Sequence, residues 1–154
     1  MGLLAITQYI FENDGHGKFS DVSLKYGLDF KNCGNVTDIV WIDLNDDTYL
    51  DAIVVGYWMP IKVFLNDGTK LVLQKNTHLE KTNGWWNTIK VNDFDNDGDL
   101  DFIAGNWGLN TRLQASKNEP ITLYSNDFDN NGTVDPVITY YYQKQETPFA
   151  SKDE

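Results

Sequence analysis

Short apolar runs rich in β-branched and aromatic residues alternate with acidic segments along most of the chain. Such runs are too short for ordinary helices, and their Ile, Val, Trp and Tyr content predicts β-strands. The runs come in pairs, and an acidic segment separates the two members of each pair. The three pairs are residues 38–42 with 51–57, residues 89–91 with 102–104, and residues 121–124 with 137–142.

Several of these predicted strands are apolar at consecutive positions. Residues 52–55, Ala-Ile-Val-Val, are an example. Alternating apolar and polar positions would indicate a strand with one buried face, whereas a continuous apolar run indicates burial on both faces. We therefore expect small sheets that stack face to face.

Two other segments predict tight hairpins. Residues 11–19 and 64–68 each carry Asn-Asp-Gly shortly after a Phe, a sequence that favours a turn between antiparallel strands.

The acidic segments start at residues 43, 93 and 127, so their starts are 50 and 34 residues apart, near the roughly 40 to 50 residues of a propeller blade. We expect an all-β protein of about three antiparallel β-propeller blades, a partial propeller, because a closed ring needs about four to eight.

Each acidic segment has the same spacing of oxygen-bearing side chains, at positions 1, 3, 5 and 9 of nine residues. Alternate residues of a tight loop point inward, and Ca²⁺ takes six to eight oxygen ligands at about 2.3 to 2.6 Å. A backbone carbonyl at position 7 would complete most of this shell. The candidate ligands are Asp43, Asn45, Asp47, Tyr49 and Asp51; Asp93, Asp95, Asp97, Asp99 and Asp101; and Asp127, Asp129, Asn131, Thr133 and Asp135.

The charge of these loops also favours a bound cation, because carboxylates only a few ångströms apart repel one another. We predict two to three Ca²⁺ ions. An EF-hand is excluded, since it requires Glu at position 12 and flanking helices, and position 12 is Val54, Ala104 or Ile138.

The residue at position 6 distinguishes the first loop from the other two. Gly98 and Gly132 readily adopt a left-handed backbone, whereas the β-branched Thr48 does so only at a conformational cost. The second loop has Asp at positions 1, 3, 5 and 9, whereas the third has Asn131 at position 5 and the first has Asn45 at position 3. We therefore expect loop 93–101 to bind Ca²⁺ most tightly, loop 127–135 next and loop 43–51 most weakly.

The composition narrows the choice of partners. The 154 residues include 12 Lys and Arg against 23 Asp and Glu, a formal net charge of −11, which disfavours binding to nucleic acid or to an anionic membrane. Cys33 is the single cysteine, so no disulfide forms within one copy. The longest apolar run, residues 52–61, is shorter than the roughly 18 residues of a membrane span.

With these features the chain resembles the FG-GAP or VCBS repeats, the calcium-loop β-propeller blades of integrin α-subunit heads and many bacterial surface proteins. The resemblance is carried by the three acidic loops, by residues 53–56 and 102–105 after the first two loops, and by the hairpin at 13–19. Residues 105–110 and 148–151 are similar to large VCBS-containing proteins of Bacteroidetes-type bacteria. The resemblance implies an exported ligand-binding or adhesive propeller and no catalytic residues.

We predict a single repeat array in three parts. Residues 1–33 would form a partial blade, residues 34–83 a blade with the first acidic loop, and residues 84–154 the blade or blades with the other two. The first residues lack the basic region and cleavage site of a signal peptide, and we expect a segment of a longer protein. The family resemblance implies an extracellular, cell-surface or periplasmic location. The expected partners are the remaining blades of a parent chain or further copies of this chain.

Aromatic residues are a weaker candidate for ligand binding. Flat indole rings suit the faces of sugars, although packing between blades is the interpretation that we favour for them. The candidates are Trp58, Trp85, Trp86 and Trp107.

Three functions remain open. The first, which we favour, is a calcium-stabilised adhesion or binding module for a protein or a carbohydrate. The second is the scaffold of a carbohydrate-active enzyme whose catalytic residues lie largely outside this chain, and the third is a structural spacer. A glycosidase would need two carboxylates about 5 to 10 Å apart, and nothing in the sequence places Glu80, Glu119 and Glu146 together. We expect no enzyme activity from the chain itself.

Overall fold

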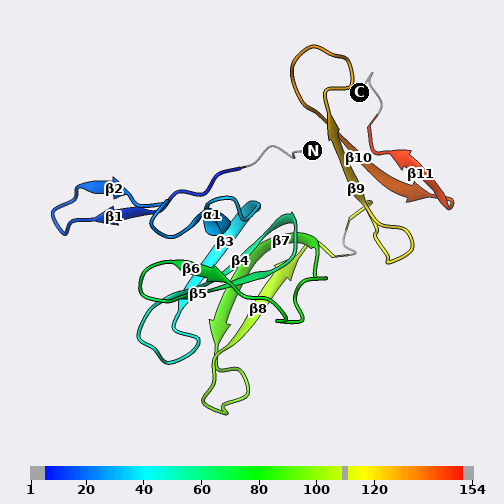
Figure 1. Cartoon of the computed structure of the whole chain (residues 1–154). Coiled ribbons are helices and arrows are strands. Elements are labelled where there is room, and N and C mark those ends of the chain that lie inside the picture. Colours follow the sequence, from blue (N-terminus) through cyan, green and yellow to red (C-terminus); the bar gives the residue numbers. More distant parts are fainter. Residues whose placement is uncertain (1–5, 109–110, 151–154) are drawn as a thin grey trace. The chain divides into compact units, whose positions relative to one another are not determined.

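The computed structural model describes residues 6–108 and 111–150, and these residues form antiparallel β-sheets with one short helix (Figure 1). The prediction of an all-β fold is confirmed. Leu109, Asn110 and Ser151, which contribute to the family resemblance, lie outside the described residues. In chain order the elements are β1 (Phe11–Asn13), β2 (Phe19–Asp21), α1 (Leu28–Lys31), β3 (Asn35–Ile42), β4 (Asp51–Met59), β5 (Lys62–Asn66), β6 (Leu71–Leu73), β7 (Gly84–Asn92), β8 (Asp101–Asn106), β9 (Thr122–Asn126), β10 (Asp135–Tyr142) and β11 (Gln145–Pro148).

The described residues divide into two compact units, one of residues 6–106 and one that begins at residue 107. The described strands form three separate sheets, and no closed ring occurs among them. The helical part of the described chain includes no segment with the length and apolar character needed to cross a membrane. The division into blades that we expect from the sequence stays a prediction.

Strand β4 is the centre of the larger unit. It pairs with β3 from Asp51 to Tyr57, and on its other side it pairs with β5 near its start and with β7 near its end. The β5–β6 and β7–β8 pairs extend the sheet from there (Figure 1). Every apolar residue from position 52 to position 55 is buried.

Two apolar cores lie on the two faces of β4. Ala52 and Val54 belong to the first core, together with Phe64 of β5 and Phe30 of α1. Ile53 and Val55 belong to the second core, which also includes Ile89 of β7. Consecutive side chains of a strand point to opposite faces, so the apolar run fills both cores, as the sequence predicts.

The β7–β8 pair repeats the β3–β4 pair with a shift of 50 residues. Every paired position in β7–β8 has a counterpart in β3–β4 whose number is lower by 50, from Asn92 opposite Asp101 to Trp86 opposite Asn106. Both pairs also have an irregularity at the same place, next to Thr37 in β3 and next to Asn87 in β7. The two acidic loops therefore connect structurally equivalent strands.

The smaller unit is a three-stranded sheet in the order β11–β10–β9. The third acidic loop connects β9 to β10, and a tight turn at Gln143 and Lys144, both with positive φ, connects β10 to β11. Leu113 and Thr139 are its buried residues among those described. This unit thus has a much smaller apolar interior than the larger one.

Candidate functional site

The first aspartate of each acidic loop folds the loop around its own carboxylate. In the second loop, Asp93 Oδ1 accepts a hydrogen bond from Asp97 N at 3.2 Å, and Asp93 Oδ2 accepts one from Gly98 N at 3.1 Å. Asp43 and Asp127 accept the corresponding pairs of bonds at 2.7 to 3.1 Å. Bonds between an Asx side chain and the following backbone stabilise turns of this kind.

The last aspartate of each loop closes it from the other end. Asp51, Asp101 and Asp135 each accept a hydrogen bond on Oδ2 from the backbone N–H of the residue at position 2, at 2.9, 3.1 and 3.0 Å. Positions 1 and 9, the two ends of the loop, are therefore held together by the same pattern of bonds in all three copies.

The backbone turns twice through the left-handed region in every loop. Position 6 has φ values of 75°, 98° and 87°, so Thr48 adopts the conformation that Gly98 and Gly132 adopt. Position 4 is also left-handed, with φ between 57° and 61°. We did not predict this second turn, although the sequence contains its signal, an Asp or Asn at position 4 of each loop, because these residues tolerate positive φ better than most.

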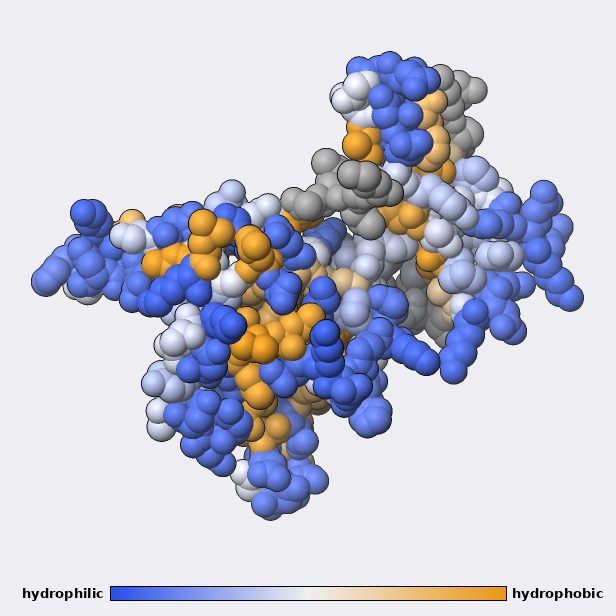
Figure 2. Space-filling view, viewed as in Figure 1, coloured by the Kyte–Doolittle hydropathy of each residue, from blue (hydrophilic) through white to orange (hydrophobic). Residues whose placement is uncertain are grey.

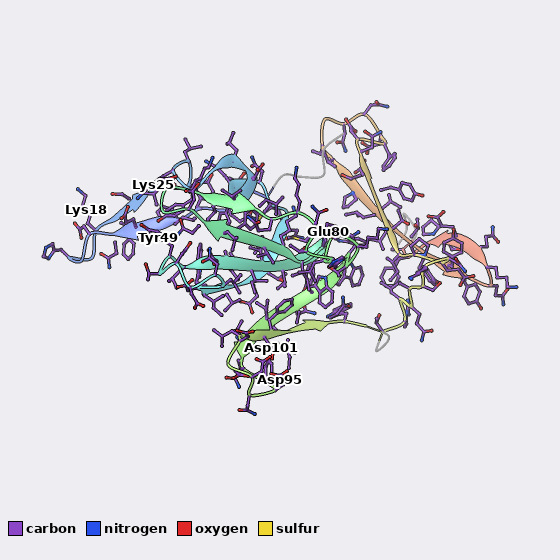
Figure 3. The ribbon with its side chains drawn as sticks, turned by 60° about the horizontal axis from the view of Figure 1, so that its bottom comes forward. Lys18, Lys25, Tyr49, Glu80, Asp95 and Asp101 are labelled. Carbon is purple, nitrogen blue, oxygen red and sulfur yellow. The ribbon has the colours of Figure 1, made fainter. Side chains whose placement is uncertain are left out.

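Two of the loops bring three carboxylates together. One oxygen from each member of the set lies within 4.8 Å of the others. Two ligands on opposite sides of a Ca²⁺ ion, each at about 2.3 to 2.6 Å, are up to about 5 Å apart, so this spacing fits the ion. The sets are Asp93, Asp95 and Asp101 in the second loop, and Asp127, Asp129 and Asp135 in the third. Figure 3 shows Asp95 and Asp101 at the loop end of β7–β8.

The first loop differs at two of these positions. Asn45 replaces the position-3 carboxylate, and its amide nitrogen donates to Asp47 Oδ2 at 2.9 Å. Asp51 is fully buried, and its Oδ1 accepts a second backbone bond, from Asn66 N of β5 at 2.7 Å. Both Asp51 oxygens therefore already have donors, which leaves this loop less suited to a cation than the other two.

The remaining candidate ligands have more local roles in the structure. Asp97 Oδ1 accepts from Asp99 N at 2.9 Å, and Asn131 Oδ1 accepts from Thr133 N at 2.8 Å. Tyr49 at position 7 of the first loop has its ring beside Gly68 of the β5–β6 turn. Neither position 5 nor position 7 belongs to the three-carboxylate sets.

The tryptophan candidates separate into different environments. Trp58 of β4 and Trp85 of β7 contact each other edge to face, with ring centroids 5.0 Å apart. Trp86 packs against the second core and donates from Nε1 to the Thr82 carbonyl at 2.8 Å. Trp107 is half-exposed and belongs to the other compact unit. The structure thus brings two of the four together.

The three glutamates lie in local hydrogen-bond groups. Glu80 accepts from Thr77 N at 2.8 Å, and Glu119 N donates to Ser116 Oγ at 3.0 Å. Glu146 accepts from Tyr124 at 3.1 Å, and this bond raises the pKa of the Tyr124 hydroxyl.

The comparison with protein families agrees with the loop geometry. A family described as FG-GAP-like repeat matches residues 43–104, from the start of the first acidic loop through the second loop into β8. Neither the search of curated proteins nor the search of solved structures gave a match. The matched segment includes both loops of the 50-residue structural repeat, and residues 43–104 belong to the FG-GAP-like repeat family.

Proposed function

We propose that this chain is a calcium-stabilised, β-propeller-type module that binds a protein or carbohydrate ligand and is not itself an enzyme. The observation that carries the proposal is the clustering of three carboxylates in each of two equivalent loops, with one oxygen from each residue within 4.8 Å of the others. The FG-GAP-like repeat supports the propeller-type architecture.

The donor set favours Ca²⁺ over other common ions. Zn²⁺ prefers Cys and His ligands, and these loops offer carboxylate, amide and carbonyl oxygens. Mg²⁺ demands a near-octahedral shell at about 2.0 to 2.1 Å, whereas Ca²⁺ accepts six to eight oxygens in irregular geometry. Short exposed loops that supply many oxygens therefore suit Ca²⁺ best.

The role of the ion would be structural. It would neutralise carboxylates that the loop hydrogen bonds hold close together, and it would fix the connection between two strands. Calcium sites of extracellular modules often have dissociation constants of about 10⁻⁴ to 10⁻³ M, which suits calcium levels outside cells. We accordingly propose that the module works outside the cytoplasm, in an exported or cell-surface protein.

The proposed ligand surface includes the Trp58–Trp85 pair. Aromatic rings supply much of the binding energy at protein interfaces, and their amphipathic faces also suit sugars. Replacing Trp58 by Ala should weaken ligand binding and leave calcium binding unchanged, which separates the two parts of the proposal.

Calcium titration calorimetry of the chelator-treated chain tests the calcium sites. We expect two stronger sites and a weaker third. Replacing Asp95 by Asn gives the second loop the position-3 residue of the first loop, and should weaken that site by roughly tenfold, because affinity follows ligand charge. Replacing Asp129 by Asn should do the same to the third loop.

The alanine variants at position 1 test the order of affinity. Asp93→Ala should cause the largest loss of calcium affinity, Asp127→Ala a smaller one and Asp43→Ala the smallest. Asp29→Asn, in α1 and outside the loops, is the control and should leave all sites intact. Absence of calcium binding, or a largest loss at Asp43, would contradict the assignment.

A further inference from the structure

The β1–β2 hairpin resembles the β5–β6 hairpin, with one more residue in its turn. Asn13-Asp14-Gly15 occupies the place of residues 66–68 in sequence and in hydrogen bonding. Gly15 N donates to Asn13 Oδ1 at 3.1 Å, and the equivalent Gly68 N donates to its own Asn, Asn66, at 3.1 Å. Both turns also close with a bond from the Asp backbone N–H to a Lys carbonyl, at 3.0 and 3.1 Å.

The β5–β6 hairpin shows what such a hairpin does in a complete blade. Gln74 N donates to the Val63 carbonyl, so the backbone groups of Val63 face β6. Successive residues of a strand direct their N–H and C=O groups to opposite neighbours. The backbone groups of Phe64 therefore face β4. Phe64 indeed pairs with Ala52, and Asn66 N donates to Asp51 at the end of the acidic loop. The hairpin thus completes the sheet and covers the last loop aspartate.

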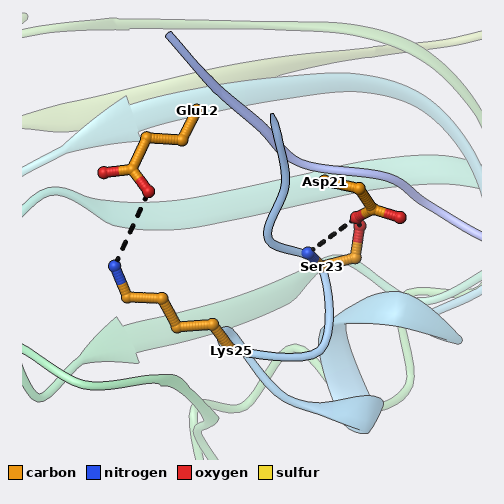
Figure 4. Close-up of polar contacts among 4 residues, drawn as sticks. All are labelled: Glu12, Asp21, Ser23 and Lys25. Atoms are coloured by element: carbon orange, nitrogen blue, oxygen red, sulfur yellow. Dashed lines mark hydrogen bonds and ion pairs between the residues drawn. The ribbon is translucent and has the colours of Figure 1, made fainter. Parts of the chain in front are cut away.

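The β1–β2 hairpin has no such partner strand among the described residues. Val22 N donates to the Ile10 carbonyl, so the same alternation directs the backbone groups of Phe11 and Asn13 away from β2. Phe11 and Phe19 are 57% and 61% exposed, whereas their counterparts Phe64 and Leu71 are 0% and 3% exposed. The opposite face of the hairpin is polar, and Oε2 of its Glu12 lies 3.9 Å from Nζ of Lys25 (Figure 4).

Strand β8 lacks the complementary element. It ends its sheet, and no described strand pairs with it on the side away from β7. By the 50-residue repeat, Asp101, Phe102 and Ala104 correspond to Asp51, Ala52 and Val54, which β5 and β6 cover. Asp101 is exposed, whereas Asp51 is buried. In the third loop the corresponding strand, β10, is already paired with β11 on its outer side.

A hairpin and a β8 strand of the same copy are on opposite sides of β4. Ile10 and Tyr26, at the base of the hairpin, pack against the first core, whereas Phe102 and Ala104 pack against the second. Figure 1 shows the hairpin extending away from the β3–β8 sheet of its unit. Figure 2 shows apolar atoms exposed near the base of the hairpin, beside the segment that leads to α1.

We propose that the β1–β2 hairpin of one copy pairs with the open edge of β8 of a second copy and completes its blade. In the register of β5 on β4, Phe11 lies opposite Phe102. Phe11 and Phe19 then become buried as Phe64 and Leu71 are. Such head-to-tail contacts build a ring or a chain of copies.

Sedimentation velocity over a concentration series tests this contact, at moderate salt to screen repulsion between acidic copies. The average mass of the unmodified chain should rise with concentration above the 17.6 kDa of one copy. The double variant Phe11→Ser/Phe19→Ser should stay at the mass of one copy. Phe128→Ser, a control that removes an equally exposed ring (54%) from the third loop, should associate like the unmodified chain.

A complementation experiment tests the pairing of hairpin with edge. Ala104 corresponds to Val54, which pairs with Lys62 of β5, so the N–H of Ala104 points away from β7. Ala104→Pro removes this N–H, and Pro is tolerated at such edge positions. This variant alone should not associate. Mixed with the double Phe variant, which retains its β8 edge, it should form a one-to-one complex of two copies and nothing larger.

Hydrogen exchange of the unmodified chain gives a readout that needs no variant of β8. The amides of Phe102 and Ala104 should become more protected as concentration rises, while that of Ile103, directed at β7, should not change. A constant mass of one copy, association of the double Phe variant, failure of the mixture to form a complex, or exchange independent of concentration would each overturn the proposal.

Discussion

At the scale of single residues, Thr48 is the clearest departure from the loop pattern. It has φ of 75° at a position where the other loops have Gly, and a left-handed backbone costs an L-residue about 1 to 2 kcal/mol. Replacing Thr48 by Gly removes this cost, but Gly also has more conformational freedom in the unfolded chain, which offsets part of the gain. We expect Thr48→Gly to stabilise the folded state by up to about 1 kcal/mol, measured by urea unfolding with a chelator present.

The reverse change in the second loop is the matched control. A Cβ at Gly98 would meet no atom within 4 Å, so Gly98→Thr tests the backbone conformation without a steric clash. It should destabilise the folded state by about 1 kcal/mol or more. Equal stability of both variants and the parent chain would show that position 6 carries no conformational cost.

The spacing of oxygen-bearing residues predicts the loops well because their hydrogen bonds are local. Asp93 and Asp101 bond to backbone groups of their own nine-residue segment, so the pattern is readable from the sequence alone. The burial of Asp51 was not predictable in this way. It depends on Asn66, which the β5–β6 hairpin returns to the loop from a distance of 15 residues.

At the scale of elements, Asp38 links β3 to β7. Its Oδ2 accepts bonds from Thr88 Oγ1 at 2.9 Å and Ile89 N at 3.0 Å, and its Oδ1 accepts from Ile39 N at 2.9 Å. Desolvation opposes ionisation, but these bonds outweigh it and hold the pKa of Asp38 below its ordinary value of 3.8.

Because the folded pKa is the lower one, the Asp38 carboxylate stabilises the fold fully above about pH 4, and the contribution is lost as the pH falls through the folded pKa. Asp38→Asn should therefore cost about 1 kcal/mol near neutral pH. The difference from the parent chain should shrink in acid, as measured by unfolding free energies over a pH series. A difference that stays constant down to the lowest pH would contradict this role.

The order of strands was predictable, but the contact between β3 and β7 was not. Apolar runs and Asn-Asp-Gly turns identify β4 and the two hairpins from local sequence. The bonds of Asp38 to Thr88 and Ile89 join residues about 50 positions apart, and no local pattern encodes such a pairing. Helix α1 was likewise not predicted, and Phe30 makes it part of the first core.

At the scale of the whole molecule, the two compact units should depend on calcium to different degrees. Among the described residues, each unit has one three-carboxylate set, in the loop from Asp93 to Asp101 in the larger unit and from Asp127 to Asp135 in the smaller. The larger has two apolar cores, while Leu113 and Thr139 are the buried residues described in the smaller. Small units with little core usually need a metal, a disulfide or a partner to fold.

We therefore expect chelation to unfold residues 111–150 first and to leave β3–β8 folded, as hydrogen exchange of the full chain would detect. An ion at 100 times its dissociation constant stabilises its site by about 2.7 kcal/mol, a large fraction of the stability of so small a unit. Asp129→Asn should shift the protection of β9–β11 to calcium concentrations roughly tenfold higher, because it weakens the third site by that factor, whereas Asp95→Asn should leave this calcium dependence unchanged. Equal responses of both units to either change would mean that they fold as one cooperative body and share the stabilisation from both ions.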